Sequence, residues 1–165
     1  AAAVTKSAAY PGGNLANVTD IAAGGSHSLF IANDPASPPV KVWACGYNVF
    51  GQLGVGDGTD RNLGVVPVAF PAMTATNPPI QVAAGLDHSL VLLKDTTVWA
   101  WGYNFSGQLG NGVTVGYDIR VATPVQVKRL DGTFLTDVTK IVAIGNHNLA
   151  RESHGQLCGC GDKTF

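Results

Sequence analysis

The apolar residues of the chain occur in short runs that are separated by glycine, proline and polar turns. Ser28–Ile31 and Ser89–Leu93 are runs of this kind, and their length favours strands that are buried on both faces. A polar turn, Lys94–Thr96, leads from the second run into Thr97–Trp101, which is rich in residues that favour strands. No window shows the apolar spacing and caps of a helix. The pattern predicts an all-β chain of small antiparallel sheets.

The chain contains an internal repeat. Gly46–Gly54 reads GYNVFGQLG, and Gly102–Gly110 reads GYNFSGQLG. Upstream, AAGGSHSL begins at Ala22 and AAGLDHSL at Ala83, with a weaker third copy, VAIGNHNL, at Val142. A repeat whose period equals the interval from Gly46 to Gly102 is typical of propellers or arrays, and not of a single folded unit.

Two further phrases complete each unit. The strand VWACG at Val42 matches VWAWG at Val98 and LCGCG at Leu157, and a Pro-Val segment follows at Pro67 and again at Pro124. Each unit therefore predicts four short strands. The segment with proline suits the edge of the sheet, because a missing N–H is harmless there.

Taken together, these phrases resemble the repeat of the regulator of chromosome condensation family, over roughly residues 18–161. The resemblance implies a β-propeller, in which four-stranded blades surround a central channel, and members of the family usually close a ring of seven blades. We expect about two and a half to three blades. The expected boundaries are 1–17 for a leader or the end of a preceding blade, 18–79 and 80–137 for two blades, and 138–165 for a partial third.

The third copy of GQLG is missing from these residues. An open arc of blades leaves unpaired strand edges, which proteins normally avoid. We therefore expect either the remaining blades of a longer chain or self-association that completes a ring.

The repeated residues are expected to serve the architecture. His27, His88 and His147 share one repeat position, which distributes them around a ring instead of gathering them at a metal, and we expect buried imidazoles bonded to backbone. The repeated glycines lack the Lys-Ser/Thr and the helix of a phosphate loop. The residues expected to have a structural role are His27, His88, His147, Trp43, Trp99, Gly51, Gln52, Leu53, Gly54, Gly107, Gln108, Leu109 and Gly110.

Cys45, Cys158 and Cys160 are the three cysteines of the chain, and their spacing differs from the C-x-x-C of redox and zinc sites. We expect free, buried thiols that act as small hydrophobic groups. No acid–base pair or Ser-His-Asp set stands apart from the repeat. The sequence thus predicts no catalytic residue, cofactor or metal.

The charge of the chain bears on which kind of partner it can bind. Charged residues make up 13% and the net charge is −1, without a basic cluster, so we expect no nucleic-acid partner. No run approaches the ~18 apolar residues of a membrane span. The small, polar start AAAVTKS fits a mature terminus after signal cleavage or an internal fragment. We expect an extracellular or cell-surface location, with a cytoplasmic or nuclear one as the alternative.

Segments that vary between repeats are the candidates for function, because propellers present loops on a rigid scaffold. They are Asn33–Lys41, Gly56–Gly64, Pro71–Pro79, Asn111–Val121 and Lys128–Thr136.

The candidate contact residues within these segments are Arg61, Tyr117, Arg120 and Phe134, since arginine and aromatic side chains dominate binding hot spots. We predict a non-enzymatic module that binds a protein. The resemblance leaves two alternatives: nucleotide exchange on a Ran-type GTPase, and a secreted protein-inhibitor propeller.

Overall fold

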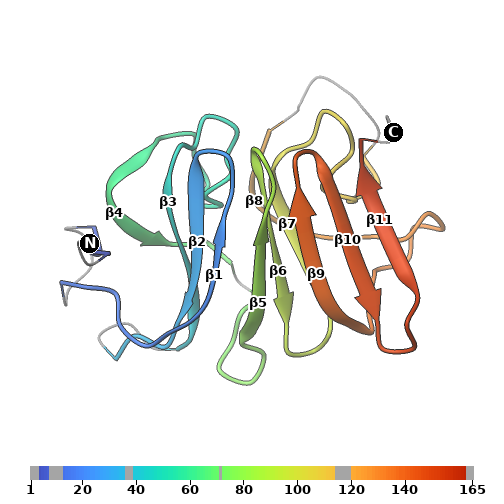
Figure 1. Cartoon of the computed structure of the whole chain (residues 1–165), viewed down its shortest axis with the longest axis horizontal. Coiled ribbons are helices and arrows are strands. Elements are labelled where there is room, and N and C mark those ends of the chain that lie inside the picture. Colours follow the sequence, from blue (N-terminus) through green and yellow to red (C-terminus); the bar gives the residue numbers. More distant parts are fainter. Residues whose placement is uncertain (1–3, 8–12, 36–38, 71, 114–119, 163–165) are drawn as a thin grey trace.

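The computed structural model describes residues 4–7, 13–35, 39–70, 72–113 and 120–162. In these ranges all the regular structure is strand, and three antiparallel sheets stand side by side (Figure 1). Blade 1 consists of β1 (Val18–Ala23), β2 (His27–Ala32), β3 (Lys41–Gly46) and β4 (Arg61–Pro67). Blade 2 consists of β5 (Pro79–Ala84), β6 (His88–Leu93), β7 (Val98–Tyr103) and β8 (Arg120–Gln126). Blade 3 consists of β9 (Val138–Ile144), β10 (His147–Glu152) and β11 (Leu157–Gly161).

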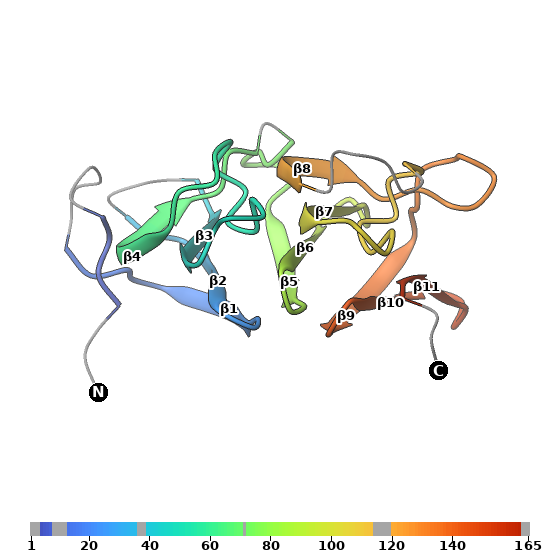
Figure 2. The ribbon, with the colours of Figure 1, turned by 90° about the horizontal axis from the view of Figure 1, so that it is seen from above.

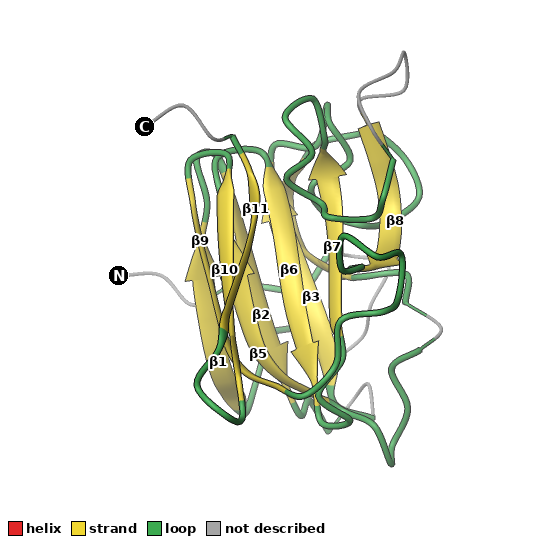
Figure 3. Ribbon diagram, turned by 90° about the vertical axis from the view of Figure 1, so that its right-hand side faces the viewer, coloured by secondary structure: helices red, strands yellow, loops and turns green. Residues whose placement is uncertain are grey.

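Every sheet is an antiparallel meander, in which each strand pairs with its neighbour in sequence. Seen from above, the sheets fan out, with β1, β5 and β9 toward one side and β4 and β8 toward the other (Figure 2). A third view shows strands joined by loops, without a helix among the described residues (Figure 3). The all-β fold of about three blades is therefore confirmed, while the exact blade boundaries stay predictions.

The apolar core lies between successive blades. Residues of two sheets pack together in each interface and lose nearly all contact with solvent. The first interface includes Leu29, Val42, Val82, Val91 and Trp101, and the second includes Leu90, Val98, Ile141 and Ala150. Burial of both faces explains why these strands read as apolar runs instead of alternating patterns.

The GQLG loops seal the interfaces. Leu53 lies in the first and Leu109 in the second, and both side chains are fully buried. Gly51 has a φ of 78°, and a Cβ there would lie 2.7 Å from the Cα of Ala122 in blade 2. Glycine is required at this position because both the backbone conformation and the close approach exclude a side chain.

Residues 4–7 and 13–15 adopt the arrangement of the connection that enters blade 3. Leu15 N–H donates to Val4 O at 2.9 Å, and Leu135 N–H donates to Val127 O at the same distance. Lys6 of this segment forms a buried ion pair with Asp34, with 3.0 Å between Nζ and Oδ2. This part of the expected leader is therefore integrated into blade 1.

The burial of Leu109 makes the interface between blades 2 and 3 sensitive to its removal. Replacing Leu109 with alanine is expected to lower the free energy of unfolding by ~2–5 kcal/mol, because the buried side chain leaves a cavity. Urea unfolding followed by circular dichroism measures the change. Leu130→Ala is the matched control, since Leu130 is fully exposed, and it should change the stability by less than ~0.5 kcal/mol. Equal effects of the two substitutions would contradict the assignment.

Candidate functional site

The repeated histidines join neighbouring blades. His27 Nε2 lies 2.8 Å from Ser89 Oγ, and the Ser89 hydroxyl donates its single proton to Gln52 O at 2.7 Å. His27 Nε2 is therefore the donor. We expected His27 to form a hydrogen bond with the backbone, and this expectation is wrong. Its partner is the side chain of Ser89 in the next blade.

The second interface repeats this arrangement with different side chains. His88 Nε2 donates to Asn148 Oδ1 at 2.7 Å, so backbone partnership is wrong here too. The Asn148 amide then donates to the Gln108 carbonyl, which also accepts from the Cys160 thiol at 3.3 Å. The equivalent carbonyl of Gln52 accepts from the Trp101 indole at 2.8 Å. His147 stands in blade 3 and is only half-buried.

Burial sets the charge of both joining histidines. It lowers the pKa of His27 to about 4, with a further contribution from the charge of His88. Burial also lowers the pKa of His88, while the hydrogen bond to Asn148 acts in the opposite direction. Both imidazoles are thus neutral near pH 7.

Arg61 and Arg120 lie at the same end of adjacent blades. Arg61 pairs with Gly46 across β3 and β4, and Arg120 pairs with Tyr103 across β7 and β8. A Cβ on Gly58 of blade 1 would lie 2.5 Å from Arg120 Nη1, so the guanidinium of blade 2 rests on the loop of blade 1. The variable segments 56–64 and 111–121 are not loops over their full length, because β4 begins at Arg61 and β8 begins at Arg120.

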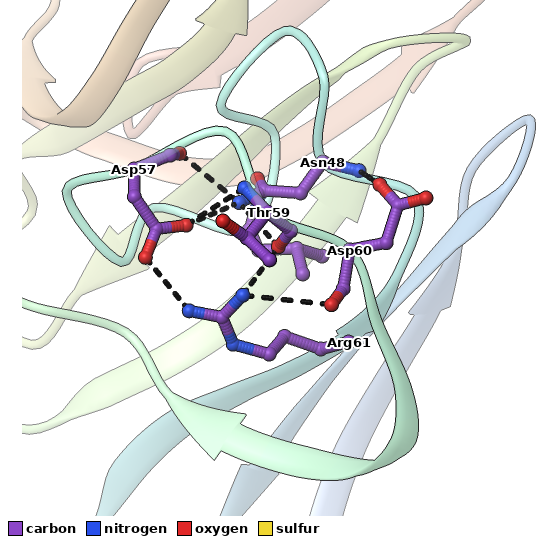
Figure 4. Close-up of polar contacts among 6 residues, drawn as sticks. Asn48, Asp57, Thr59, Asp60 and Arg61 are labelled. Carbon is purple, nitrogen blue, oxygen red and sulfur yellow. Dashed lines mark hydrogen bonds and ion pairs between the residues drawn. The ribbon is translucent and has the colours of Figure 1, made fainter.

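The loop that carries Arg61 is held by its own polar side chains (Figure 4). Asn48 N–H donates to Asp60 Oδ1 at 2.8 Å, and the Asn48 amide donates to Thr59 O at 3.0 Å. Arg61 Nη2 lies 2.7 Å from Asp57 Oδ2. The N–H of Thr59, with smaller effects of Arg61 and Asn48, lowers the pKa of Asp57 although desolvation opposes it. The loop therefore presents a fixed, ionised arrangement.

A row of aromatic rings lies at the same end of the blades as the two arginines. The ring centroids of Tyr47 and Phe50 are 6.3 Å apart, those of Phe50 and Tyr103 4.7 Å, and those of Tyr103 and Phe105 6.2 Å. Phe105 is 55% exposed. With the arginines, these rings make a surface across blades 1 and 2. We call it the arginine–aromatic surface: Tyr47, Phe50, Arg61, Tyr103, Phe105 and Arg120.

Sequence reasoning missed the four aromatic members, because they belong to the repeated phrase that was assigned to architecture. A usable signal was present, since an aromatic residue directly follows Gly46 and Gly102 at the end of a strand. Phe134 lies at the opposite end of the blades, where its ring is 5.7 Å from Lys128 Nζ. Tyr117 lies outside the described residues. Phe134 therefore lies apart from Arg61 and Arg120.

The three cysteines are free, as expected, but they are half-buried and not buried as expected. Desolvation raises the pKa of Cys45, Cys158 and Cys160. The Glu152 carboxylate raises the pKa of Cys158 further, and it accepts a hydrogen bond from the Cys158 thiol at 3.3 Å. Thiols held protonated in this way are poor nucleophiles.

Two further observations concern the described residues. Their His, Cys, Asp and Glu side chains do not gather in groups of three or more that suit a metal ion. Among the described residues, there is no helix that is long and apolar enough to cross a bilayer.

Antiparallel blades that dock through a repeated loop and a repeated histidine define an arc of a β-propeller. The sequence profile described as "Regulator of chromosome condensation (RCC1) repeat" matches residues 41–92 and 95–151, and a related profile with the same description matches residues 80–108. The chain belongs to the regulator of chromosome condensation repeat family.

Relatives share parts of this arc. The Ultraviolet-B receptor UVR8 of Arabidopsis thaliana is 34% identical over 98 residues, which cover 59% of this chain and 20% of the receptor. The Probable E3 ubiquitin-protein ligase HERC6 of Homo sapiens is 32% identical over 144 residues, covering 87% of this chain and 13% of the ligase. The chain thus spans a fifth or less of the length of these relatives.

The structure of Prp20p from Saccharomyces cerevisiae superimposes with a TM-score of 0.69 at 25% identity, covering 94% of this chain and 33% of Prp20p. That structure is described together with the binding of Prp20p to Gsp1p and histones.

The buried histidines make stability dependent on pH. The folded pKa of His27 is about 4, below the ordinary value of 6.5, so between these values the unfolded chain binds the additional proton. The contribution of His27 is complete above pH 6.5 and is lost as the pH falls toward 4, a change of roughly 3 kcal/mol. Urea unfolding between pH 7.5 and 4 measures it. The His27→Gln variant retains a donor for Ser89 and should show a shallower dependence; identical slopes would refute the assignment.

Proposed function

We propose that the chain is a protein-interaction segment of a propeller and binds a protein partner through the arginine–aromatic surface. The observation that carries the proposal is that Arg61 and Arg120 lie at the same end of two adjacent blades as a row of four aromatic rings contributed by both blades. Arginine, tyrosine and phenylalanine are enriched in protein interfaces, and arginine and tyrosine supply many of the hot spots.

The rigidity of the surface supports binding. Arg61 is already held by Asp57 and its neighbours, so little rotamer freedom is lost when a partner docks. Arg120 is exposed, and it takes part in none of the ion pairs found among the described residues. We infer that Arg120 offers its donors to a carboxylate of the partner, and that the rings of Phe50 and Phe105 supply apolar contact area.

The proposed activity is non-enzymatic. In support, the histidines with strongly lowered pKa lie between blades and bond to Ser89 and Asn148, away from the arginine–aromatic surface. Their perturbation follows from burial in the core, so it marks architecture and not acid–base catalysis.

Nucleotide exchange on a Ran-type GTPase is the second candidate. The similarity to Prp20p, whose structure is described with its binding to Gsp1p, favours it, and it requires the partner to be a small GTPase. A nuclear or cytoplasmic setting is compatible with this relative. The extracellular location expected from the sequence receives no support from the relatives reported above.

The test is partner capture with matched variants. The polypeptide is immobilised, and proteins retained from native extract are quantified by mass spectrometry. We expect Arg120→Glu and Phe105→Ala each to reduce the same retained protein at least about tenfold, because both side chains are exposed on one surface. Lys94→Glu alters an exposed cation elsewhere on blade 2 and should leave retention unchanged.

Retention that is indifferent to both surface substitutions would reject the proposed site. An exchange assay with a Ran-type GTPase and labelled nucleotide separates the two candidate functions. Acceleration of nucleotide release that is lost in Arg120→Glu would favour the second candidate over simple binding.

A further inference from the structure

The rings of the arginine–aromatic surface form a continuous row that crosses from blade 1 to blade 2. Tyr47 and Phe50 belong to the first GYN loop, and Tyr103 and Phe105 belong to the second. Phe50 and Tyr103 join the two blades, with their ring centroids 4.7 Å apart. The chemistry of this row indicates which kind of partner segment the proposed surface binds.

The exposure of the row is a property of the repeat. Phe105 is 55% exposed, and Val49, which holds the same position in the loop of blade 1, is 46% exposed. The loop of Val49 packs against blade 2, which has all four of its strands, so a complete neighbouring blade leaves this position open. Tyr47, Phe50 and Tyr103 are half-buried. The row therefore presents apolar surface at one end of two fully formed blades.

The two tyrosines carry hydroxyl groups without a hydrogen-bond partner in the described part of the chain. The contacts found there for Tyr47 and Tyr103 are ring contacts with Phe50 and Phe105. A tyrosine hydroxyl usually finds a hydrogen-bond partner when it is buried, and it can donate to a carbonyl oxygen. The row thus combines apolar rings with two donors that are open to a partner.

Arg120 places a cation directly beside Tyr103. The two residues stand opposite each other in the pairing of β7 and β8, and side chains in that position lie on the same face of a sheet, with Cβ atoms about 5 Å apart. Arg61 follows the same arrangement near Tyr47 but already pairs with Asp57 at 2.7 Å (Figure 4). The ion pairs found among the described residues do not include Arg120, so its guanidinium is available to an acid of the partner.

We propose that the arginine–aromatic surface binds a proline-rich segment that contains an acidic residue. This rests on the proposed function and names the chemistry of the partner. Proline-rich segments adopt the polyproline II helix and dock on rows of aromatic side chains. The helix rises about 3.1 Å per residue, so two residues span about 6.2 Å. The centroids of Tyr47 and Phe50 are 6.3 Å apart and those of Tyr103 and Phe105 are 6.2 Å apart, so one dipeptide extends over each pair.

The backbone of such a segment supplies the acceptors that the tyrosines lack. Its carbonyls form no hydrogen bonds within the helix, and proline has no N–H to satisfy. Tyr47 and Tyr103 each donate to one carbonyl, while pyrrolidine rings pack on Phe50 and Phe105. A carboxylate of the segment lies at Arg120, where the guanidinium can donate two hydrogen bonds to it. Binding costs little conformational entropy, because proline already restricts the backbone of the segment.

Two other classes of ligand suit the surface less well. A cationic side chain can lie on aromatic rings, but Arg120 repels it at this site. Sites for single-stranded nucleic acid combine aromatic rings with a positively charged path for the phosphates. Here the loop of blade 1 contributes the carboxylates of Asp57 and Asp60 next to Arg61, and these oppose a phosphate backbone. The uncharged backbone of a proline-rich segment meets neither obstacle.

The test uses fluorescein-labelled peptides and fluorescence anisotropy with the intact polypeptide. The probe is Glu-Pro-Pro-Leu-Pro-Pro-Glu, and serine replaces every proline in the matched control peptide. We expect the proline peptide to bind at least about tenfold more tightly, because the serine peptide loses more backbone freedom and has no pyrrolidine rings. Equal affinity of the two peptides, or no binding of the proline peptide at millimolar concentration, would overturn the proposal.

Charge reversal locates the acid of the segment. A third peptide has lysine in place of both glutamates. At low ionic strength the unmodified chain should prefer the glutamate peptide at least about tenfold, and Arg120→Glu should prefer the lysine peptide, a gain that a misfolded variant cannot produce. Lys94→Glu alters an exposed cation elsewhere on blade 2 and should leave both affinities unchanged. A preference for glutamate that survives Arg120→Glu would overturn the proposal.

Single substitutions examine the row itself. Tyr103→Phe removes only the free hydroxyl, and it should weaken binding of the proline peptide roughly threefold to tenfold without changing thermal unfolding. Phe105→Ala removes an exposed ring and should weaken binding about tenfold. Circular dichroism verifies that each variant folds. Affinity that is indifferent to both substitutions would place the peptide elsewhere on the chain and overturn the proposal.

Failure of this proposal differs from failure of the proposed function. If Arg120→Glu and Phe105→Ala abolish retention of a protein from extract while the proline peptide does not bind, the surface binds a protein of different chemistry. Retention that is indifferent to both substitutions rejects the surface and this proposal with it. A labelled oligothymidine that binds more tightly than the proline peptide would favour nucleic acid and overturn the proposal.

Discussion

The main-chain carbonyl of the glutamine in each GQLG loop is the contact on which the arc depends. Gln52 O accepts from Ser89 and Trp101, and Gln108 O accepts from Asn148 and Cys160. A buried carbonyl left without partners would cost roughly 1–3 kcal/mol, so the next blade must bring donors to this point. The leucine that follows each glutamine is then enclosed between the sheets. One loop thus sets the distance and the rotation from blade to blade.

The same position accepts different chemistry in successive blades. The hydroxyl oxygen of Ser89 accepts a hydrogen bond from His27, and the side-chain oxygen of Asn148 accepts one from His88. Arg129–Glu152 in blade 3 corresponds to Lys6–Asp34 in blade 1, because in both the basic residue of an entering segment pairs with an acid at the end of the second strand or just beyond it. Phe70 takes the corresponding place before blade 2 and packs on Trp99, 4.8 Å between ring centroids. The architecture requires satisfied partners at each position, and several pairs of side chains satisfy them.

The proposed binding surface combines repeated positions, Tyr47 and Tyr103, with positions that vary between the repeats, Phe50 and Phe105. On the arginine–aromatic surface the backbone is held by Asn48 and Asp57, while the rings and Arg120 remain available.

The sequence by itself determined the all-β fold, the family and the number of blades, because repeated glycines, prolines and apolar runs are local signals of turns and buried strands. It also separated the repeated residues from the variable ones. The tertiary structure decided which groups meet. His27 and Ser89 are 62 positions apart, and their contact depends on how two sheets dock. Arg61 and Arg120 lie at the same end of adjacent blades, and Phe134 lies toward the other end, because strand direction and the docking of the sheets place these side chains. Local spacing in the sequence determines neither.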